Sequence, residues 1–264
     1  MEILGYIGAL LVGLVLGLIG GGGSILTVPI LVYLIGLNPI TATAYSLFVV
    51  GVTSVIGTIQ NLKKGLVDVK TAIIFAIPAF IAVYLTRLYI IPSIPETLFT
   101  IGNLEVTNNI FIMVLFAFIM LLASLSMIFK KTKNSKDDSE TEITYNFPLI
   151  ALEGLVVGVL TGLVGAGGGF LIIPALVLLA KLPMKKAVGT SLLIIAAKSL
   201  IGFLGDLSNL EIDWIFLLIF TSISVVGIII GVYLSKFISG KKLKAGFGWF
   251  TLIMAFYIIY KELF

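Results

Sequence analysis

The sequence predicts an all-α polytopic membrane protein built from two inverted repeats of about five membrane segments each. The chain has 264 residues, of which 59% are hydrophobic and 11% charged, and its mean hydropathy is +1.21. Soluble domains are about 45–50% apolar and about 25% charged. Apolar runs of the ~20 residues that cross a bilayer recur along the chain, and one glycine-rich motif occurs twice. Composition, run length and repetition therefore indicate the same fold class.

The internal repeat aligns residues 13–29 with residues 158–174. The offset of 145 positions continues along the chain, for example from Ser46 to Ser191. We therefore expect a first membrane repeat at residues 3–129, a charged linker at residues 130–146 and a second membrane repeat at residues 147–264. The mixture of Lys, Asp and Glu in the linker predicts a solvated cytoplasmic tether.

Each repeat contains five apolar segments. We expect them at residues 3–20, 24–37, 41–60, 71–89 and 109–129, and at residues 147–164, 169–182, 187–204, 212–234 and 245–260. The first segment lacks the basic start and the cleavage site of a signal peptide, so we keep it as a membrane segment. In both repeats the second segment is short and begins at a glycine cluster, which favours a half-helix or re-entrant hairpin and leaves open whether it spans fully.

Lysine distribution predicts the orientation, because cytoplasmic loops carry the excess of basic residues. With five passes per repeat, or three passes and a hairpin, fourteen lysines fall on one side and only Arg87 and Lys261 on the other. Four passes per repeat would split the same charges seven against nine. We therefore expect the repeats to be inverted across the membrane, with both termini outside. The fourteen are Lys63, Lys64, Lys70, Lys130, Lys131, Lys133, Lys136, Lys181, Lys185, Lys186, Lys236, Lys241, Lys242 and Lys244.

The two glycine clusters are the predicted substrate-binding backbone. A helix that begins inside the membrane has unpaired N–H groups and about half a positive charge at its start, which suits an anion. Short, glycine-broken segments at matching positions of inverted repeats indicate a transporter's midplane site, where we expect the second segments to meet. Upstream glycines such as Gly13 and Gly158 favour helix packing instead. The cluster positions are Gly20, Gly21, Gly22, Gly23 and Ser24, with Gly165, Ala166, Gly167, Gly168 and Gly169.

Four polar side chains complete the predicted site. Lys198 is the basic residue in the middle of an apolar run, and an intramembrane charge normally faces a partner or a cavity. Substrate contact, a salt bridge to Glu153 and snorkelling all remain open for this lysine. Ser46, Thr190 and Ser191 offer hydroxyls on the third segments, where such groups bind either a ligand or a neighbouring backbone.

Several classes of protein are disfavoured by composition. The chain has no Cys and no His, so thiolate or histidine chemistry and most transition-metal sites are excluded. We expect no catalytic residue, no metal and no cofactor, and hence no enzyme. The net charge of +4 comes from loop lysines and does not indicate nucleic acid. A cation transporter would need paired buried carboxylates, whereas Glu153 is the only acidic residue that lies well inside an expected membrane segment.

The twice-repeated pattern Gly-x-x-x-Gly-x-x-Gly-x-Gly-Gly-x-x-x-x-x-Pro, with Ala187-Val-Gly-Thr190-Ser191-Leu, resembles the sulfite exporter TauE/SafE family of membrane permeases over nearly the whole chain. Asp206 stands where the family commonly has histidine. The resemblance implies transport of small sulfur-containing anions, namely sulfite, thiosulfate or organosulfonates, across the cell (plasma) membrane of a prokaryote.

Alternating access in a secondary transporter is the mechanism we expect for this chain. An anion channel, or a carrier of another small anion, is the alternative. The expected partners are the anion and membrane lipid, and the sequence leaves open the exact substrate, the direction of transport, coupling to protons and assembly into a homo-oligomer.

Overall fold

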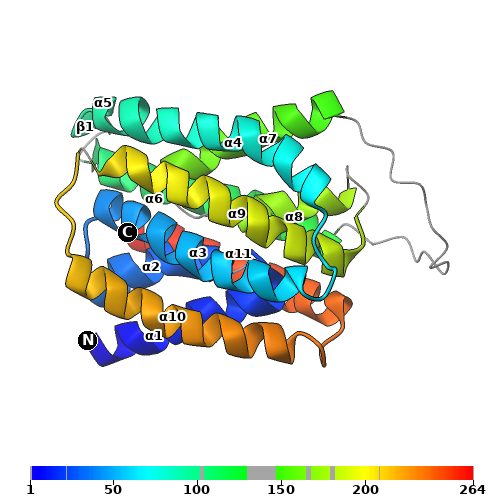
Figure 1. The fold of residues 1–264 in the computed structure, drawn as a ribbon. Helices are drawn as coiled ribbons and strands as arrows, with labels where there is room; N and C mark the ends of the chain where they lie inside the picture. The colour runs from blue at the N-terminus through cyan, green and yellow to red at the C-terminus, as the bar shows by residue number, and fades with distance from the viewer. Residues whose placement is uncertain are drawn as a thin grey trace.

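The structure is a computed structural model that describes residues 2–21, 23–101, 104–129, 147–164, 168–178, 182–207 and 209–263. Long helices lie side by side along one common direction (Figure 1). In chain order the elements are α1 (Glu2–Ile19), α2 (Gly23–Pro29), the π-helix η1 (Ile30–Ile35), α3 (Pro39–Leu62), α4 (Val69–Leu85), the π-helix η2 (Thr86–Ile90), α5 (Ile91–Ser93), β1 (Thr97–Ile101), β2 (Leu104–Thr107), α6 (Asn108–Phe129), α7 (Phe147–Val164), α8 (Gly169–Leu178), α9 (Met184–Asp206), α10 (Trp214–Leu234) and α11 (Gly240–Leu263).

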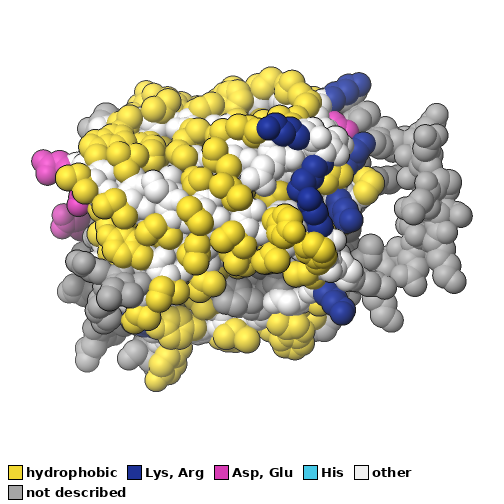
Figure 2. Space-filling model, turned by 60° about the horizontal axis from the view of Figure 1, so that its bottom comes forward, with side chains coloured by type: hydrophobic (Ala, Val, Ile, Leu, Met, Phe, Trp, Pro, Cys, Tyr) yellow, Lys and Arg dark blue, Asp and Glu magenta, His cyan; other side chains and the backbone are white. Residues whose placement is uncertain are grey.

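The helices have the length and surface of a membrane protein. Within the described residues, four spans are long and apolar enough to cross a bilayer, and shorter apolar helices accompany them. Large apolar side chains such as Ile73, Phe118 and Ile215 point outward, and the space-filling view shows them spread over the face that it presents (Figure 2). Such a surface suits lipid. The predicted polytopic, mostly helical membrane protein is therefore confirmed. The four spans are Pro39–Leu62, Val69–Ser93, Met184–Asp206 and Trp214–Leu234.

Helix pairing joins the two sides of the linker. α1 packs along α10, α7 along α4, α3 along α9 and α6 along α11, so each pair takes one helix from either side. Glycines permit the closest approaches, because a Cβ at Gly13 or Gly17 would overlap the α10 main chain, and a Cβ at Gly158 would overlap the main chain of Ala79 in α4. These contacts agree with the packing role that the sequence favours for the upstream glycines.

The centre of the molecule is formed by α3 and α9. Their apolar spans are each 67% buried, compared with 39% for the span Val69–Ser93, which begins with α4, and 44% for α10. Helix starts follow local capping chemistry: the Asp68 carboxylate accepts from the Thr71 N–H at 2.9 Å, and the repeat-related Asp213 accepts from the Phe216 N–H at 3.1 Å. Each carboxylate satisfies a helix N–H that has no intrahelical partner.

The segment between α5 and α6 corrects the all-α prediction. β1 pairs antiparallel with β2, with Thr97 opposite Thr107 and Ile101 opposite Leu104. The sequence Thr97-Leu-Phe-Thr-Ile101 is rich in β-branched and aromatic residues, which favour strands. The hairpin was missed because hydropathy identifies membrane segments but does not assign structure to the connections between them.

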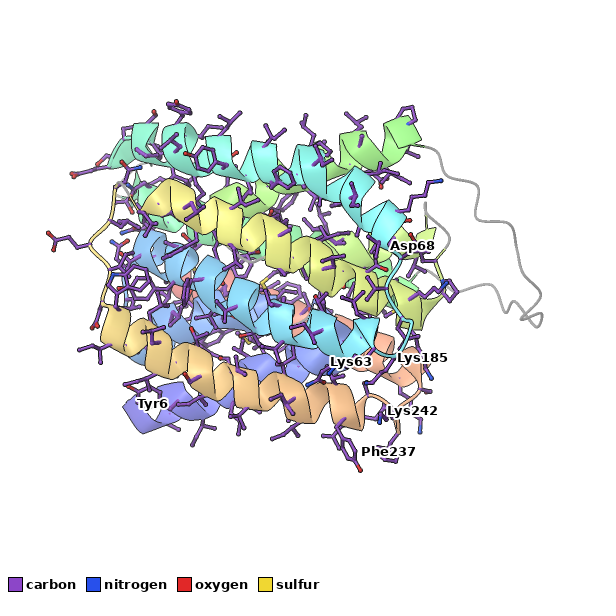
Figure 3. The ribbon with its side chains drawn as sticks, in the orientation of Figure 1. Tyr6, Lys63, Asp68, Lys185, Phe237 and Lys242 are labelled. Atoms are coloured by element: carbon purple, nitrogen blue, oxygen red, sulfur yellow. The ribbon has the colours of Figure 1, made fainter. Side chains whose placement is uncertain are left out.

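The two ends of the helix bundle differ in charge. Both chain termini lie at one end in Figure 1, which we call the terminal end. Lys and Arg side chains gather at the opposite end (Figure 2), where Figure 3 places Lys63, Lys185 and Lys242. We call this the basic end.

Candidate functional site

Two glycine turns meet inside the bundle. Gly20, after α1, has a φ of +78°, and Gly168, before α8, has a φ of +68°, a conformation that only glycine adopts without strain. A Cβ at Gly21 would overlap the main chain of Gly169, and a Cβ at Gly169 would overlap Gly21. The first-repeat turn therefore touches the second-repeat turn backbone to backbone, with no space for a side chain.

Helix α9 holds the Gly20 turn in place. The Ser191 hydroxyl donates to the Gly20 carbonyl at 2.8 Å and contacts the Val188 carbonyl at the same distance. A Cβ at Gly20 would lie 2.6 Å from a Val188 methyl group and 2.8 Å from its carbonyl oxygen. One face of α9 thus fixes a main-chain carbonyl of the turn, and Gly20 is required both by its φ and by this close approach.

Lys198 lies two helical turns beyond Ser191, against the other glycine turn. It is fully buried, and its ammonium donates to the Thr161 hydroxyl of α7 at 2.6 Å. A Cβ at Gly168 would come 2.5 Å from the lysine Nζ. The positive charge predicted for this region is therefore adjacent to the start of α8.

The described partner of Lys198 is not the one that the salt-bridge alternative requires. Thr161 accepts from the lysine, whereas Glu153 lies eight positions earlier on the same helix, about 12 Å along the axis at ~1.5 Å per residue. Glu153 is also only partly buried. Thr161 lies within the second glycine motif, directly before Gly162, but it was not singled out because hydroxyls are common in membrane helices.

The remaining predicted site residues have different surroundings. The Thr190 hydroxyl accepts from the Asp68 N–H at 2.8 Å, and at the matching position of the first repeat the Tyr45 hydroxyl accepts from the Asp213 N–H at 2.6 Å. Thr190 therefore bonds to the loop before α4. Ser46 is fully buried, and its hydroxyl has no hydrogen-bond partner among the described residues. Outside the described residues are Gly22, Gly165, Ala166, Gly167 and the side chain of Ser24.

A buried ion pair near the terminal end was missed from the sequence. Arg87 of η2, counted above with the connections, is fully buried, and its guanidinium lies 3.4 Å from the carboxylate of Asp206 at the end of α9. It also donates to the Thr43 hydroxyl at 3.0 Å. The signal was available, because an arginine inside an apolar segment requires a partner. Only the packing of α4 against α9 identifies that partner as Asp206.

A pocket opens at the basic end. Its lining includes Lys64, Lys185 and Lys236, with Asn61 and Ser235 as further polar groups. The other lining residues are Leu18, Ile19, Leu66, Met184, Val188 and Ile238. Because Ile19 and Val188 both adjoin Gly20, the pocket extends toward the Gly20 turn.

The arrangement suits binding of an anion more than bond chemistry. The Lys198 ammonium lies beside the Gly168 turn, where it can compensate negative charge in a medium of low dielectric constant. Among the residues that the structure describes, no group of three or more Asp, Glu, Cys or His side chains is close enough to hold a metal ion.

Comparison with known proteins gives a consistent result. The model of the family described as sulfite exporter TauE/SafE matches residues 6–258. A probable membrane transporter protein of Xylella fastidiosa is 29% identical over 255 residues, which cover 96% of this chain and 92% of the relative. The probable membrane transporter protein YunE of Bacillus subtilis is 32% identical over 227 residues, with 79% of each chain covered. A similarly named protein of Methanocaldococcus jannaschii is 27% identical over 75% of this chain and 71% of its own. No solved structure matches.

Proposed function

We propose that this chain carries small sulfur-containing anions through a site at its two glycine turns. The chain belongs to the sulfite exporter TauE/SafE family, which is a family of membrane transporters and not of enzymes. The substrates we propose are sulfite, thiosulfate or organosulfonates. The observation that carries this proposal is the buried ammonium of Lys198, which lies beside Gly168 and donates to a neutral hydroxyl.

Charge favours an anion as the substrate. A buried ammonium is costly to desolvate and is stabilised by a negative partner. The hydrogen-bond partner described for Lys198 is the neutral Thr161, so a bound anion would supply the missing negative charge. A sulfur oxyanion presents several acceptor oxygens, which matches the donor capacity of the Lys198 ammonium beside Gly168.

The helix pairs support an inverted-repeat arrangement with alternating access. Under the repeat offset, the pair α1 with α10 corresponds to the pair α7 with α4, while α3 with α9 and α6 with α11 each join equivalent segments. A two-fold axis in the membrane plane would relate the helix pairs of the two repeats in this way. We propose that the halves rock about the meeting point of Gly21 and Gly169, so that the site opens to one side at a time.

The charge difference between the ends supports an orientation. Lysines concentrate at the basic end (Figure 2), opposite the termini (Figure 1), and cytoplasmic ends of membrane proteins carry such an excess. We propose that the protein lies in the plasma membrane, with its basic end facing the cytoplasm and both termini outside. In this orientation the lysine-lined pocket is the cytoplasmic approach to the Gly20 turn.

Flux through reconstituted protein tests the proposed function. Purified full-length protein in proteoliposomes should carry radiolabelled sulfite, thiosulfate or a sulfonate with saturable kinetics and much more slowly than a channel conducts. Parallel assays with and without a pH gradient decide whether protons are coupled to transport. Absence of flux for every sulfur anion would contradict the substrate class, whereas non-saturating flux would favour an anion channel.

A further inference from the structure

Three lysines from three different elements converge on the pocket at the basic end. Lys64 follows α3, Lys185 lies in the first turn of α9 and Lys236 follows α10. Lys63 and Lys242 lie at the same end of the molecule (Figure 3) but do not line the pocket. The pocket therefore gathers particular lysines from the general basic surface, and it does so next to the Gly20 turn.

The positive charge of the pocket has no compensating acid in its lining. None of the described lining residues is Asp or Glu. Lys64 donates to the Val232 carbonyl at 3.4 Å. Lys64 is exposed, yet partial desolvation at the pocket wall, and then the positive charge of Lys236, lower its pKa from the ordinary value, so the two ammonium groups repel each other. An anion placed between them would remove this repulsion.

At the position of the other repeat that corresponds to this pocket, a cation is paired with a carboxylate. At the offset of 145 positions, Asn61 corresponds to Asp206. After a small insertion in the second repeat, residues 83–87 (Val-Tyr-Leu-Thr-Arg) align with residues 232–236 (Val-Tyr-Leu-Ser-Lys), so Lys236 corresponds to Arg87. Arg87 forms a buried ion pair with the Asp206 carboxylate, whereas Asn61 donates to the Gly57 carbonyl at 2.8 Å and brings no charge to Lys236. At the terminal end, the cation Arg87 therefore has the carboxylate of Asp206 as its partner. At the equivalent position of the basic end, Lys236 lines the pocket together with the uncharged amide of Asn61.

We propose that the pocket lined by Lys64 and Lys236 is an anion-binding site and that its ligand is a small divalent oxyanion. The oxyanion would occupy the position that corresponds, in the other repeat, to the carboxylate of Asp206. The site is separate from Lys198, which does not line the pocket, and it lies nearer the basic end because its lining residue Lys185 precedes Lys198 along α9. The proposal rests on the proposed function for its biological role, because a transported anion would pass this place. The phosphate of an anionic lipid headgroup shares the chemistry, and the experiment distinguishes it from a soluble anion.

A thiol placed in the pocket reports on occupancy without relying on transport. The chain has no Cys, so Ser235→Cys gives a single thiol among the pocket residues. Purified full-length protein in detergent is alkylated with iodoacetamide in the presence of increasing sulfate, a probe that does not react with thiols. We expect sulfate to slow alkylation, and Lys64→Gln or Lys236→Gln to raise the sulfate concentration needed by about fivefold or more, as expected for loss of a contact charge in water.

Matched variants make the result specific. Lys63→Gln removes a neighbouring lysine that does not line the pocket and should leave protection unchanged. Asn61→Asp places a carboxylate where the other repeat has one and should abolish protection without removing any cation. Protection in the Lys64, Lys236 and Asn61 variants that equals protection in the parent protein would reject the site. Protection by phosphatidylglycerol but not by sulfate would also reject it and would assign the pocket to lipid.

The outcome is separable from that of the proposed function. Intact sulfur-anion flux in proteoliposomes, together with protection that is the same in all variants, would reject this pocket alone. Lysine-dependent protection in a protein that carries no sulfur anion would reject the proposed transport while retaining the anion site. Lys64 and Lys236 are exposed, so their variants should fold, and the elution volume in size-exclusion chromatography checks this.

Discussion

The central helices α3 and α9 occupy equivalent places in the two repeats but use their polar groups differently. In α3, Thr53 donates to the Val49 carbonyl at 2.5 Å and Asn61 donates to Gly57 of the same helix. At the matching positions of α9, Lys198 reaches α7 and Asp206 reaches η2.

The two helices are therefore alike in position, but the buried charges Lys198 and Asp206 both lie on α9. We infer that α9 carries more of the substrate site than α3, although both are central and equally buried. Variants at matching positions of the two helices test this inference.

The largest difference is expected at the ends of the two helices. Asp206→Leu leaves the fully buried Arg87 without its carboxylate and should lower the free energy of unfolding by about 3–5 kcal/mol. Asn61→Ala removes one hydrogen bond within α3 and should cost about 1 kcal/mol. Thermal unfolding of both variants in detergent measures the difference, and similar losses would contradict it.

A double variant sharpens the same comparison. Arg87→Met combined with Asp206→Leu removes both buried charges and should be more stable than Asp206→Leu alone, because no unpaired ion remains. If the double variant is as unstable as the single one, the loss comes from packing around Asp206 and not from the stranded guanidinium.

The next effect concerns substrate affinity. Lys198→Met keeps the length of the side chain and removes the charge beside Gly168. A hydrogen bond from a charged donor contributes about 1.5–3 kcal/mol, so substrate affinity in proteoliposomes should fall roughly 10-fold to 100-fold, with folding spared. Thr53→Val, at the matching position of α3, should leave affinity unchanged. An unaltered affinity in Lys198→Met would remove this lysine from the proposed site.

The smallest difference is expected between the two repeat-related serines. Ser191→Ala deletes the hydrogen bond to the Gly20 carbonyl and should lower stability by about 1 kcal/mol. Ser46→Ala removes a hydroxyl for which the described residues offer no partner, so it should be neutral or slightly stabilising. Paired thermal unfolding curves check this, and an equal loss in both variants would show that Ser46 also has a structural partner.

Some features of the site were predictable and others were not. Lys198 was recognised because a charge within an apolar run is unusual, and the structure buries it fully at a glycine turn. Ser191 was weighed between ligand and neighbouring backbone, and its described hydrogen bonds go to backbone. Arg87 was placed with the connections and is buried instead. The error arose because counting charges by segment does not reveal whether a residue near a helix end faces solvent or another helix.

The sequence by itself determined the class of molecule, because apolar length, lysine distribution and repetition are local or additive properties of the chain. It thereby indicated a polytopic membrane transporter family, the glycine turns and the buried lysine. Only the tertiary structure decided which distant groups meet: Gly21 with Gly169, Ser191 with Gly20, and Arg87 with Asp206. These contacts join residues more than a hundred positions apart, and they depend on how helices from the two repeats pack, which residue spacing within one segment does not specify.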